Sequence, residues 1–261
     1  MTSNIVTNNW ITNDNSKDHD PERKEILTQD FEPEQKDEKP DIPLELLNER
    51  IDYDPFEITE GHVYLICGMT NSGKTELAFQ IVKKNALKFH RIFMWSPTID
   101  LQKCKILPKR YMSAEITEHN LEILLNYQMK NKDRGIKTLL LLDDVIGSTS
   151  GWIQSSVMGK IASSSRHYNL TTIIISQNLK ILPPVIRDNC YAIFTTCLKE
   201  HQMNTMYSLQ STFKSQTEFK EYLQKHTNQL GKFVRFNLTA DVKIRNYPFQ
   251  TTKIPPFRIQ F

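Results

Sequence analysis

The sequence lacks the features that would assign the protein to a membrane or secretory class. No run of about eighteen or more apolar residues occurs along the 261 residues. The first ten residues, MTSNIVTNNW, also contain neither a basic stretch nor an apolar one. A membrane span and a secretory signal are therefore not indicated, and we expect the protein to stay inside a cell.

Cysteine is scarce, and no internal repeat is visible. The four cysteines form no C-x-x-C pair and no recognisable metal-ligand pattern with histidine: Cys67, Cys104, Cys190 and Cys197. The sequence thus predicts neither a cysteine-based metal site nor a disulfide framework.

Charge is divided unevenly along the chain. Residues 1–60 carry 17 acidic and 6 basic residues, whereas residues 61–261 carry 13 acidic and 27 basic residues. The first part is therefore an acidic head with a net charge of −11, and the rest is a basic body with a net charge of +14. Such asymmetry favours a polyanionic partner, with nucleic acid as the first candidate, although a solvated lysine-rich surface would have the same composition.

The chain divides into four regions by composition. The head is too polar to bury enough apolar area to offset its chain entropy, so we expect it to be disordered. Short apolar runs then alternate with helical periods, which is typical of a parallel sheet covered by helices. The regions are a disordered acidic head (1–40), a lead-in that packs against the body (41–60), an α/β core (61–200), and C-terminal helices with a basic hairpin (201–261).

The apolar runs predict five buried strands. Helices are expected where apolar residues recur at intervals of four. The strands fall at 62–67, 91–96, 138–144, 170–176 and 191–197, the helices at 73–88, 118–130, within 151–168 and near 200–226, and the hairpin at 232–245.

The stretch Gly68 to Thr75, GMTNSGKT, matches the pattern G-x-x-x-x-G-K-T of a phosphate-binding loop. It follows an apolar strand and opens a helix, which is the setting in which main-chain N–H groups encircle phosphates. Lys74 would contact the β- and γ-phosphates, and the Thr75 hydroxyl would bind Mg²⁺. A simple turn would not need the lysine. The predicted nucleotide-binding residues are Gly68, Met69, Thr70, Asn71, Ser72, Gly73, Lys74 and Thr75.

Two aspartates end the third predicted strand, LLLLDD. Asp143 would complete the Mg²⁺ site with Thr75, since ligands bind at the carboxyl ends of strands in open α/β sheets. Asp144 is the candidate for positioning or deprotonating the attacking water, although many such ATPases have the longer glutamate there. A helix cap or an exposed strand end is the alternative for both residues.

Gln177 follows the fourth predicted strand and falls at the same edge of the sheet. Its amide could sense the γ-phosphate, although a glutamine at a strand end is unremarkable alone. Phosphoryl transfer also needs a cation, which a neighbouring subunit's arginine often supplies in ring-forming ATPases. Arg166 and Arg187 are the candidates, and either could instead be a surface arginine.

Together the motifs resemble the genome-packaging ATPases of the FtsK–HerA superfamily, especially the poxvirus-type branch that giant viruses, virophages and Polinton-like elements share. The motifs lie between about residues 60 and 200 and are GMTNSGKT, FMWSPT, LLLLDD, SSSRHYNLTTIIISQN and LPPVIRDN. The resemblance implies a RecA-like three-layer α/β fold whose parallel core sheet has the order 5-1-4-3-2.

The resemblance also implies a function and site roles. It implies a homo-oligomeric ring that uses ATP and Mg²⁺ to pull double-stranded DNA, irrespective of sequence, into a preformed capsid. Capsid or vertex proteins are then expected partners, and the virus-infected cell or the virion is the expected location. By the same analogy Arg166 is the arginine given to a neighbour, with Arg187 as second choice.

Basic residues near the C-terminus are further candidates for contacting DNA phosphates, unless the hairpin simply covers a sheet edge. These residues include Lys232, Arg235, Lys243 and Arg245. Three rival functions stay open. A DNA helicase or conjugation-type pump shares the motifs, a small-molecule kinase would need an arginine-rich lid that 98–137 does not provide, and a scaffold could use ATP as a structural switch.

Overall fold

A computed structural model describes residues 54–98, 107–145, 151–209, 213, 215–238 and the backbone of 246–250. The predicted acidic head and the first part of the lead-in lie outside these residues, as do Cys104, Lys243 and Arg245.

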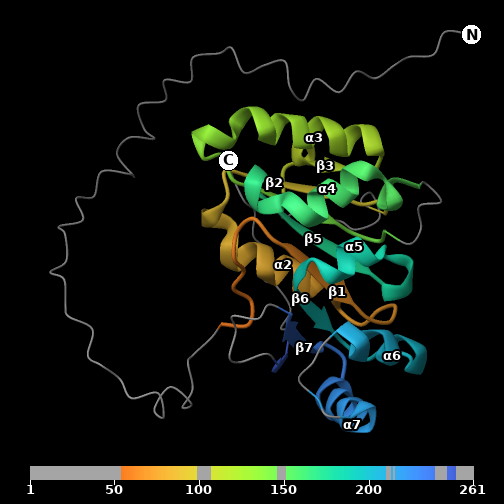
Figure 1. Ribbon diagram of the computed structural model, residues 1–261. Helices are drawn as coiled ribbons and strands as arrows, with labels where there is room; N and C mark the ends of the chain where they lie inside the picture. Colours follow the sequence, from red (N-terminus) through yellow and green to blue (C-terminus); the bar gives the residue numbers. More distant parts are fainter. Residues whose placement is uncertain are drawn as a thin grey trace, which may run out of the picture. The chain divides into compact units, whose positions relative to one another are not determined.

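The described chain forms one eight-stranded sheet with the order β3-β2-β4-β5-β1-β6-β7-β8 (Figure 1). Its central five strands are parallel and have the order that the family resemblance implied, so that prediction is confirmed. The strands are β1 (Val63–Cys67), β2 (Arg91–Trp95), β3 (Met112–Ser113), β4 (Thr138–Leu142), β5 (Leu170–Ser176), β6 (Cys190–Thr195), β7 (Lys232–Asn237) and β8 (Asn246–Gln250).

The sheet extends beyond the predicted core on both sides. The two-residue β3 pairs in parallel with β2, while β7 pairs antiparallel with β6 and with β8. The predicted C-terminal hairpin is thus an antiparallel pair that continues the main sheet. Its second strand lies at 246–250, later in the chain than the alternation up to residue 245 suggested.

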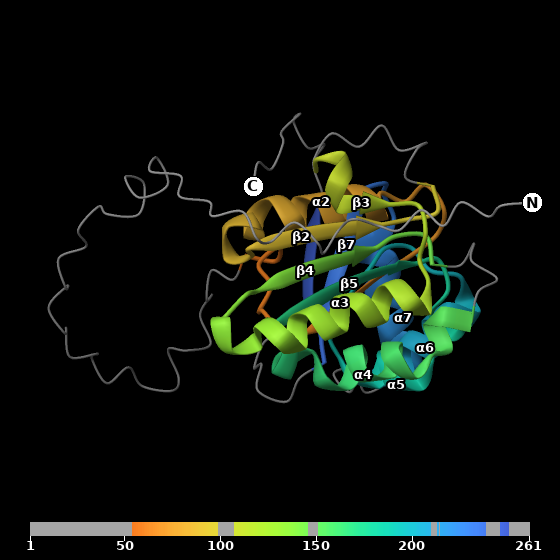
Figure 2. The same ribbon diagram turned by 90° about the horizontal axis from the view of Figure 1, so that it is seen from above.

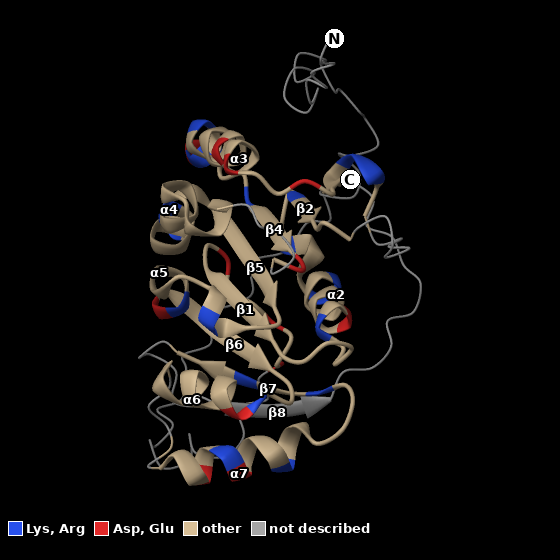
Figure 3. Ribbon diagram, turned by 90° about the vertical axis from the view of Figure 1, so that its right-hand side faces the viewer, with Lys and Arg blue, Asp and Glu red and all other residues tan. Residues whose placement is uncertain are grey.

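Helices cover both faces of the sheet, which makes the three layers that were expected. Figure 2 shows α2 on one face and α3, α4, α5, α6 and α7 on the other. Their bounds are α2 (Lys74–Asn85), α3 (Glu118–Asn131), α4 (Ser156–Ser164), α5 (Pro184–Asp188), α6 (Glu200–Leu209) and α7 (Gln216–Thr227). Charged residues lie mainly on the helices and loops, and most of the central sheet carries none (Figure 3).

Alternating side chains of the strands divide the core into two layers. On β1, Val63, Leu65 and Cys67 belong to the cluster that α3 to α7 cover, whereas Tyr64 and Ile66 belong to the cluster under α2. All five are fully buried, which explains why these strands read as continuous apolar runs in the sequence.

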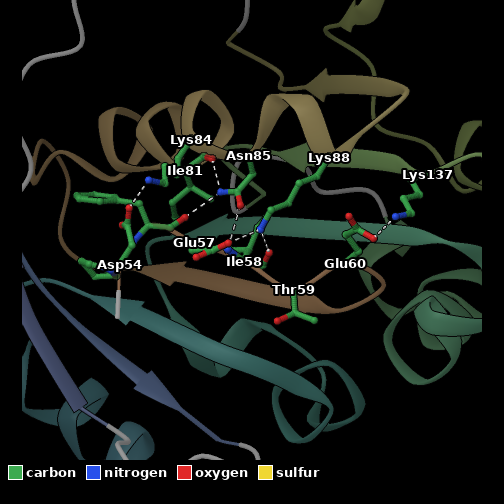
Figure 4. Close-up of polar contacts among 12 residues, drawn as sticks. Asp54, Glu57, Ile58, Thr59, Glu60, Ile81, Lys84, Asn85, Lys88 and Lys137 are labelled. Atoms are coloured by element: carbon green, nitrogen blue, oxygen red, sulfur yellow. Dashed lines mark hydrogen bonds and ion pairs between the residues drawn. The ribbon is translucent and has the colours of Figure 1, made fainter. Parts of the chain in front are cut away.

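Residues 54–60 of the lead-in pack against the α2 side of the body (Figure 4). Ile58 is buried in the core beneath α2. Asn85, the last residue of α2, accepts a hydrogen bond from the Ile58 N–H at 3.2 Å and donates one to the Phe56 carbonyl at 2.9 Å. Three ion pairs surround these contacts: Lys84–Asp54, Lys88–Glu57 and Lys137–Glu60.

Arg235 of β7 holds the same segment from the other side, and its predicted contact with DNA is wrong. The side chain is 0% exposed and lies over the Phe194 ring. Its Nη1 donates to the carbonyl oxygens of Pro55 and Glu57 at 3.0 and 2.6 Å. A buried guanidinium bound to the main chain cannot contact DNA phosphates, because the lead-in already occupies it.

Candidate functional site

Four parallel strands, β1, β2, β4 and β5, have their carboxyl ends side by side along one border of the sheet. Strand register aligns Cys67 of β1 with Ser176 of β5, and Leu142 of β4 with both Trp95 of β2 and Ile174 of β5. We call this border the carboxyl edge, and the opposite border, where the same strands begin, the amino edge. The chain segments that follow β1, β4 and β5 carry the predicted site residues.

The predicted phosphate-binding loop connects β1 to α2 and needs glycine at its start. A Cβ atom on Gly68 would stand 2.0 Å from the Thr196 Cγ2, which is far inside contact distance. Asn71 and Gly73 have φ values of 58° and 90°, in the left-handed region. Ser72 donates from its hydroxyl to the Met69 carbonyl at 2.7 Å and thereby closes the loop on itself.

Lys74, the first residue of α2, is buried against this loop. Its Nζ donates to the Met69 carbonyl oxygen at 2.6 Å. Burial lowers the pKa of the ammonium group, and the nearby carboxylate of Asp143 opposes that shift. A bound phosphate would favour the protonated form in the same way, since it would add negative charge beside the ammonium.

Thr75 and Asp143 meet at the start of α2 and the end of β4. The Thr75 hydroxyl donates to Asp143 Oδ2 at 3.1 Å, and Asp143 is only 3% exposed. A hydroxyl oxygen and a carboxylate oxygen are hard donors of the kind that Mg²⁺ prefers, together with phosphate oxygens. The residues present therefore fit the predicted magnesium site.

Asp144 has a left-handed backbone with φ 53°, which is uncommon for a residue other than glycine. Its N–H donates to Asp143 Oδ1 at 2.9 Å, so the turn after β4 holds the two carboxylates in a fixed relation. Its side chain is half-buried, unlike that of Asp143. Strained backbone of this kind occurs often at functional sites.

Gln177 follows β5 directly and contacts the phosphate-binding loop. Its Oε1 accepts a hydrogen bond from the Thr70 hydroxyl at 2.8 Å. The structure therefore brings Lys74, Thr75, Asp143 and Gln177 to one edge, with Asp144 beside them.

The two candidate arginines lie at the amino edge instead. Arg166 is exposed just before β5, and a Cβ on Gly61 would stand 3.0 Å from its Cα. Together with burial, its charge lowers the pKa of His62, which directly precedes β1. Arg187 lies in the last turn of α5, shortly before β6. A five-residue strand spans about 16 Å, so neither arginine reaches the phosphate-binding loop of its own chain.

Sequence reasoning missed the segment after β6 that packs behind the phosphate-binding loop. The Thr196 N–H donates to the Cys67 carbonyl at 3.2 Å, and the Met69 N–H points to the Cys197 carbonyl at 3.4 Å. Gln202 of α6 contacts Gln177. No pattern in the sequence marks these residues, because each acts through a partner far away along the chain.

The part of the chain that the structure describes contains neither a membrane-spanning helix nor a preformed cluster of metal ligands. No described helix is long and apolar enough to cross a membrane. The described residues contain no group of three or more His, Cys, Asp or Glu side chains that could hold a metal ion. A magnesium site here would thus depend on phosphate oxygens to complete the ligands that Thr75 and Asp143 offer.

The chain is similar to a known sequence family and to a viral protein. A family model described as "Poxvirus A32 protein" matches residues 50–229. The uncharacterized protein L437 of Acanthamoeba polyphaga mimivirus is 30% identical over an alignment covering 46% of this chain and 47% of that protein. The chain thus spans about half the length of this curated relative.

Solved structures with the same fold include a viral packaging protein and a conjugation coupling protein. The genome packaging NTPase B204 from Sulfolobus turreted icosahedral virus 2, in complex with AMPPCP, aligns with a TM-score of 0.54 at 14% identity, over 74% of this chain and 98% of that one. The pCW3 conjugation coupling protein TcpA, in monomer form with ATPγS, aligns with a TM-score of 0.50 at 14% identity, over 74% of this chain and 61% of that one. At these identities the likeness shows a shared fold.

Proposed function

Because the chain belongs to the poxvirus A32 protein family, which groups viral packaging ATPases of the FtsK–HerA type, we propose that it uses ATP hydrolysis to move double-stranded DNA into a preformed capsid. Family membership supports a viral genome-packaging ATPase that acts in virus-infected cells. The proposal adds the substrate, a DNA duplex of any sequence, and a site of action at the assembling virion.

The convergence of three side chains at the carboxyl edge carries this proposal. An ammonium group on Lys74, a carboxylate on Asp143 and an amide on Gln177 come from three different segments and meet around one loop. A loop that served only as a turn would need none of them. Phosphoryl transfer needs positioning and charge stabilisation at one point, which this arrangement supports.

The residues of the loop would bind the nucleotide. Main-chain N–H groups between Gly68 and Gly73 would surround the phosphates at the start of α2. Lys74 would turn its ammonium from the Met69 carbonyl to the phosphates, while Thr75 and Asp143 would hold Mg²⁺. The bound Mg·ATP supplies the phosphoryl group whose transfer to water releases the free energy for movement.

Asp144 and Gln177 would act around the terminal phosphate. Asp144 holds its carboxylate one residue beyond the metal-binding Asp143, where it can orient a water molecule and accept its proton. Gln177 already contacts Thr70, and its amide can exchange this contact for one with the γ-phosphate. Gln177 would therefore distinguish ATP from ADP.

A ring of identical subunits would give Arg166 a role that it cannot have within its own chain. It is exposed at the amino edge, and so a neighbouring subunit could receive it at its nucleotide. Arg187 is the second candidate for this role. The basic body, with a net charge of +14 over residues 61–261, favours contacts with the DNA backbone, and Lys232 remains a candidate for one of them.

Turnover of ATP in the presence of DNA tests the proposal. We expect long double-stranded DNA of unrelated sequences to raise the rate equally, and added salt to weaken DNA binding steeply. A rate that rises only with a small phosphoryl acceptor would instead favour a kinase. Nucleotide binding without any turnover would favour a structural switch.

The substitution Asp144→Asn tests the assignment of the water-activating residue. Asparagine tolerates the left-handed backbone that Asp144 adopts, so the turn should keep its conformation while losing the charge. We expect hydrolysis to fall by about 100-fold or more with nucleotide affinity unchanged. Full activity in this variant would remove Asp144 from the mechanism.

Rings that contain both wild-type and variant subunits test whether Arg166 acts at the nucleotide of a neighbouring subunit. Wild-type subunits are mixed with Arg166→Ala subunits at several ratios, and ATP turnover is measured for each mixture. If a ring needs the arginine of every neighbour, activity falls more steeply than the mutant fraction. A proportional fall would show that no subunit depends on its neighbour's Arg166, and the same series with Arg187→Ala then tests the second candidate.

A conjugation-type DNA pump is the alternative function, because the fold also aligns with TcpA. The two functions differ in their end point. We expect DNA to become resistant to nuclease only when empty capsids of the same virus are present with ATP. Translocation along DNA that is indifferent to capsids would favour the pump.

A further inference from the structure

We propose that Gln202 is a positioning residue that fixes Gln177 at the carboxyl edge and couples α6 to the state of the nucleotide. The inference rests on the proposed function, since it assumes that Gln177 distinguishes ATP from ADP. Gln202 lies in the first turn of α6, outside every motif that the sequence displays.

The Gln202 amide is buried, and both of its ends are hydrogen-bonded. It is 5% exposed. Its Nε2 donates to the main-chain carbonyl of Gln177 at 2.6 Å, and its Oε1 accepts from the Lys199 N–H at 3.0 Å. One side chain therefore connects the turn after β5 with the segment that leads into α6.

The bond to the carbonyl matters because it restrains the backbone from which the Gln177 side chain extends. Within the same turn, the Asn178 N–H donates to the Ser176 hydroxyl at 3.2 Å. The Gln177 side chain then accepts from Thr70 in the phosphate-binding loop at 2.8 Å. Gln202, Gln177 and Thr70 thus form a continuous path from α6 to the loop.

A second contact joins the same two regions. The segment leading into α6 lies directly behind the phosphate-binding loop, where Thr196 fills the space that a Cβ on Gly68 would need. The Met69 N–H also points to the Cys197 carbonyl. Helix α6 is therefore connected to the nucleotide site at two points, through Gln202 and through the segment that contains Thr196 and Cys197. A shift of Gln177 on loss of the γ-phosphate would reach α6 through these contacts.

A purely local role for Gln202 would be to cap α6. With Lys199 as the cap residue, Gln202 is the third residue of the helix, and its Oε1 bonds back to the Lys199 N–H as in a capping box. Glutamate makes this bond as well as glutamine. A glutamate carboxylate, however, has no N–H to donate to the Gln177 carbonyl. The substitution Gln202→Glu therefore separates the cap from the contact with Gln177.

Gln128 provides a matched control at the amino edge of the sheet. It is also a buried glutamine, and its Nε2 donates to the Tyr168 carbonyl at 3.0 Å while its Oε1 accepts from the Thr138 hydroxyl at 3.0 Å. The substitution Gln128→Glu removes the same kind of bond, but near the amino ends of β4 and β5. It should lower stability without affecting Gln177.

The experiment combines Gln202→Glu, Gln177→Ala and the double variant in a cycle. For each protein, the ratio of affinities for ATPγS and ADP is measured with Mg²⁺, along with kcat and KM for ATP. Hydrogen exchange of the peptide covering Ser176 to Asn178 is measured without nucleotide. We expect Gln202→Glu to reduce both the affinity ratio and kcat by about tenfold, with faster exchange, because one buried hydrogen bond is lost.

In the Gln177→Ala background, Gln202→Glu should have no further effect on the affinity ratio or on kcat. Additive effects would show that Gln202 acts by its charge or through α6 alone, and would overturn the proposal. Wild-type behaviour of Gln202→Glu would assign the residue to the cap. A wild-type protein that hydrolyses no ATP would refute the proposed function, while the exchange rates would still decide whether Gln202 fixes the turn.

Discussion

The carboxyl edge and the lead-in contact region, where residues 54–60 meet Asn85 and Arg235, both contain buried polar side chains. The two regions use these side chains in opposite ways. In the lead-in contact region, Arg235 and Asn85 bind main-chain groups of residues 55–58 and hold that segment in place. At the carboxyl edge, Lys74, Asp143 and Gln177 converge on one loop, and Asp144 beside them has a strained backbone. Buried charge alone therefore does not identify a site. A site is identified when polar groups from separate segments converge on a common point.

Removing Lys74 should give the largest effect and leave the lead-in contact region intact. We expect Lys74→Ala to weaken binding of a fluorescent ATP analogue by roughly 1,000-fold, because loss of one partner in a buried charged contact costs about 4 kcal/mol. Lys84→Ala on the same helix should bind normally. Retained affinity in Lys74→Ala would contradict the assignment of the loop.

Arg235→Met should have the opposite effect to Lys74→Ala, because it should lower stability without changing nucleotide affinity. The substitution leaves the carbonyls of Pro55 and Glu57 without their donor, so we expect the free energy of unfolding in urea to fall by about 3 kcal/mol. Affinity for the ATP analogue should stay unchanged at a temperature where the variant is folded. Lys232→Ala on the same strand, where the side chain is half-buried, should cost little. Weaker DNA binding with unchanged stability would instead make Arg235 a DNA contact.

Gly68→Ala should affect both stability and binding, because the glycine belongs to the loop and packs against Thr196. The added methyl group must displace the segment behind the loop, which costs about 2 kcal/mol of stability. ATP analogue affinity should fall as well. The control is Gly159→Ala within α4, where a Cβ meets nothing within 4 Å and should stabilise the helix by about 0.5 kcal/mol or more. Equal behaviour of the two variants would refute the close contact.

Glu57→Gln should give the smallest effect. The hydrogen bond from the Lys88 ammonium holds the pKa of the Glu57 carboxyl below its ordinary value of 4.5. This pair therefore contributes stability above about pH 5 and loses it as the pH falls through the lowered pKa. Since the pair is exposed, we expect a loss of at most about 0.5 kcal/mol at pH 7 and none near pH 2. A pH-independent loss would mean that packing, rather than charge, is responsible.

The sequence predicted the sheet well because its signals are local or belong to a known family pattern. Continuous apolar runs predicted β1, β2, β4, β5 and β6, and residues four apart predicted the inner faces of the helices. The order of these strands came from the family resemblance. The positions of Lys74, Thr75, Asp143 and Gln177 at one edge followed from these elements, since parallel strands end together.

The sequence could not predict contacts between segments that are distant along the chain. Alternation in β7 was visible, but its pairing with β6 and the burial of Arg235 depend on residues 55–57, which lie far away in the sequence. Gln202 lies in the stretch near 200–226, where the sequence predicted helices but no particular role for this residue. Its partner at Gln177 appears only when β5 and α6 are placed side by side.

The segment behind the phosphate-binding loop offers a natural attachment point for a spectroscopic probe. Cys197 is exposed, whereas Cys67 and Cys190 are buried within the sheet. Burial also raises the pKa of the Cys67 thiol to about 12, which suppresses its reactivity. With Cys104 replaced by serine, a maleimide dye would label Cys197 selectively. Its fluorescence would then report each nucleotide exchange in real time, next to the backbone that touches Met69.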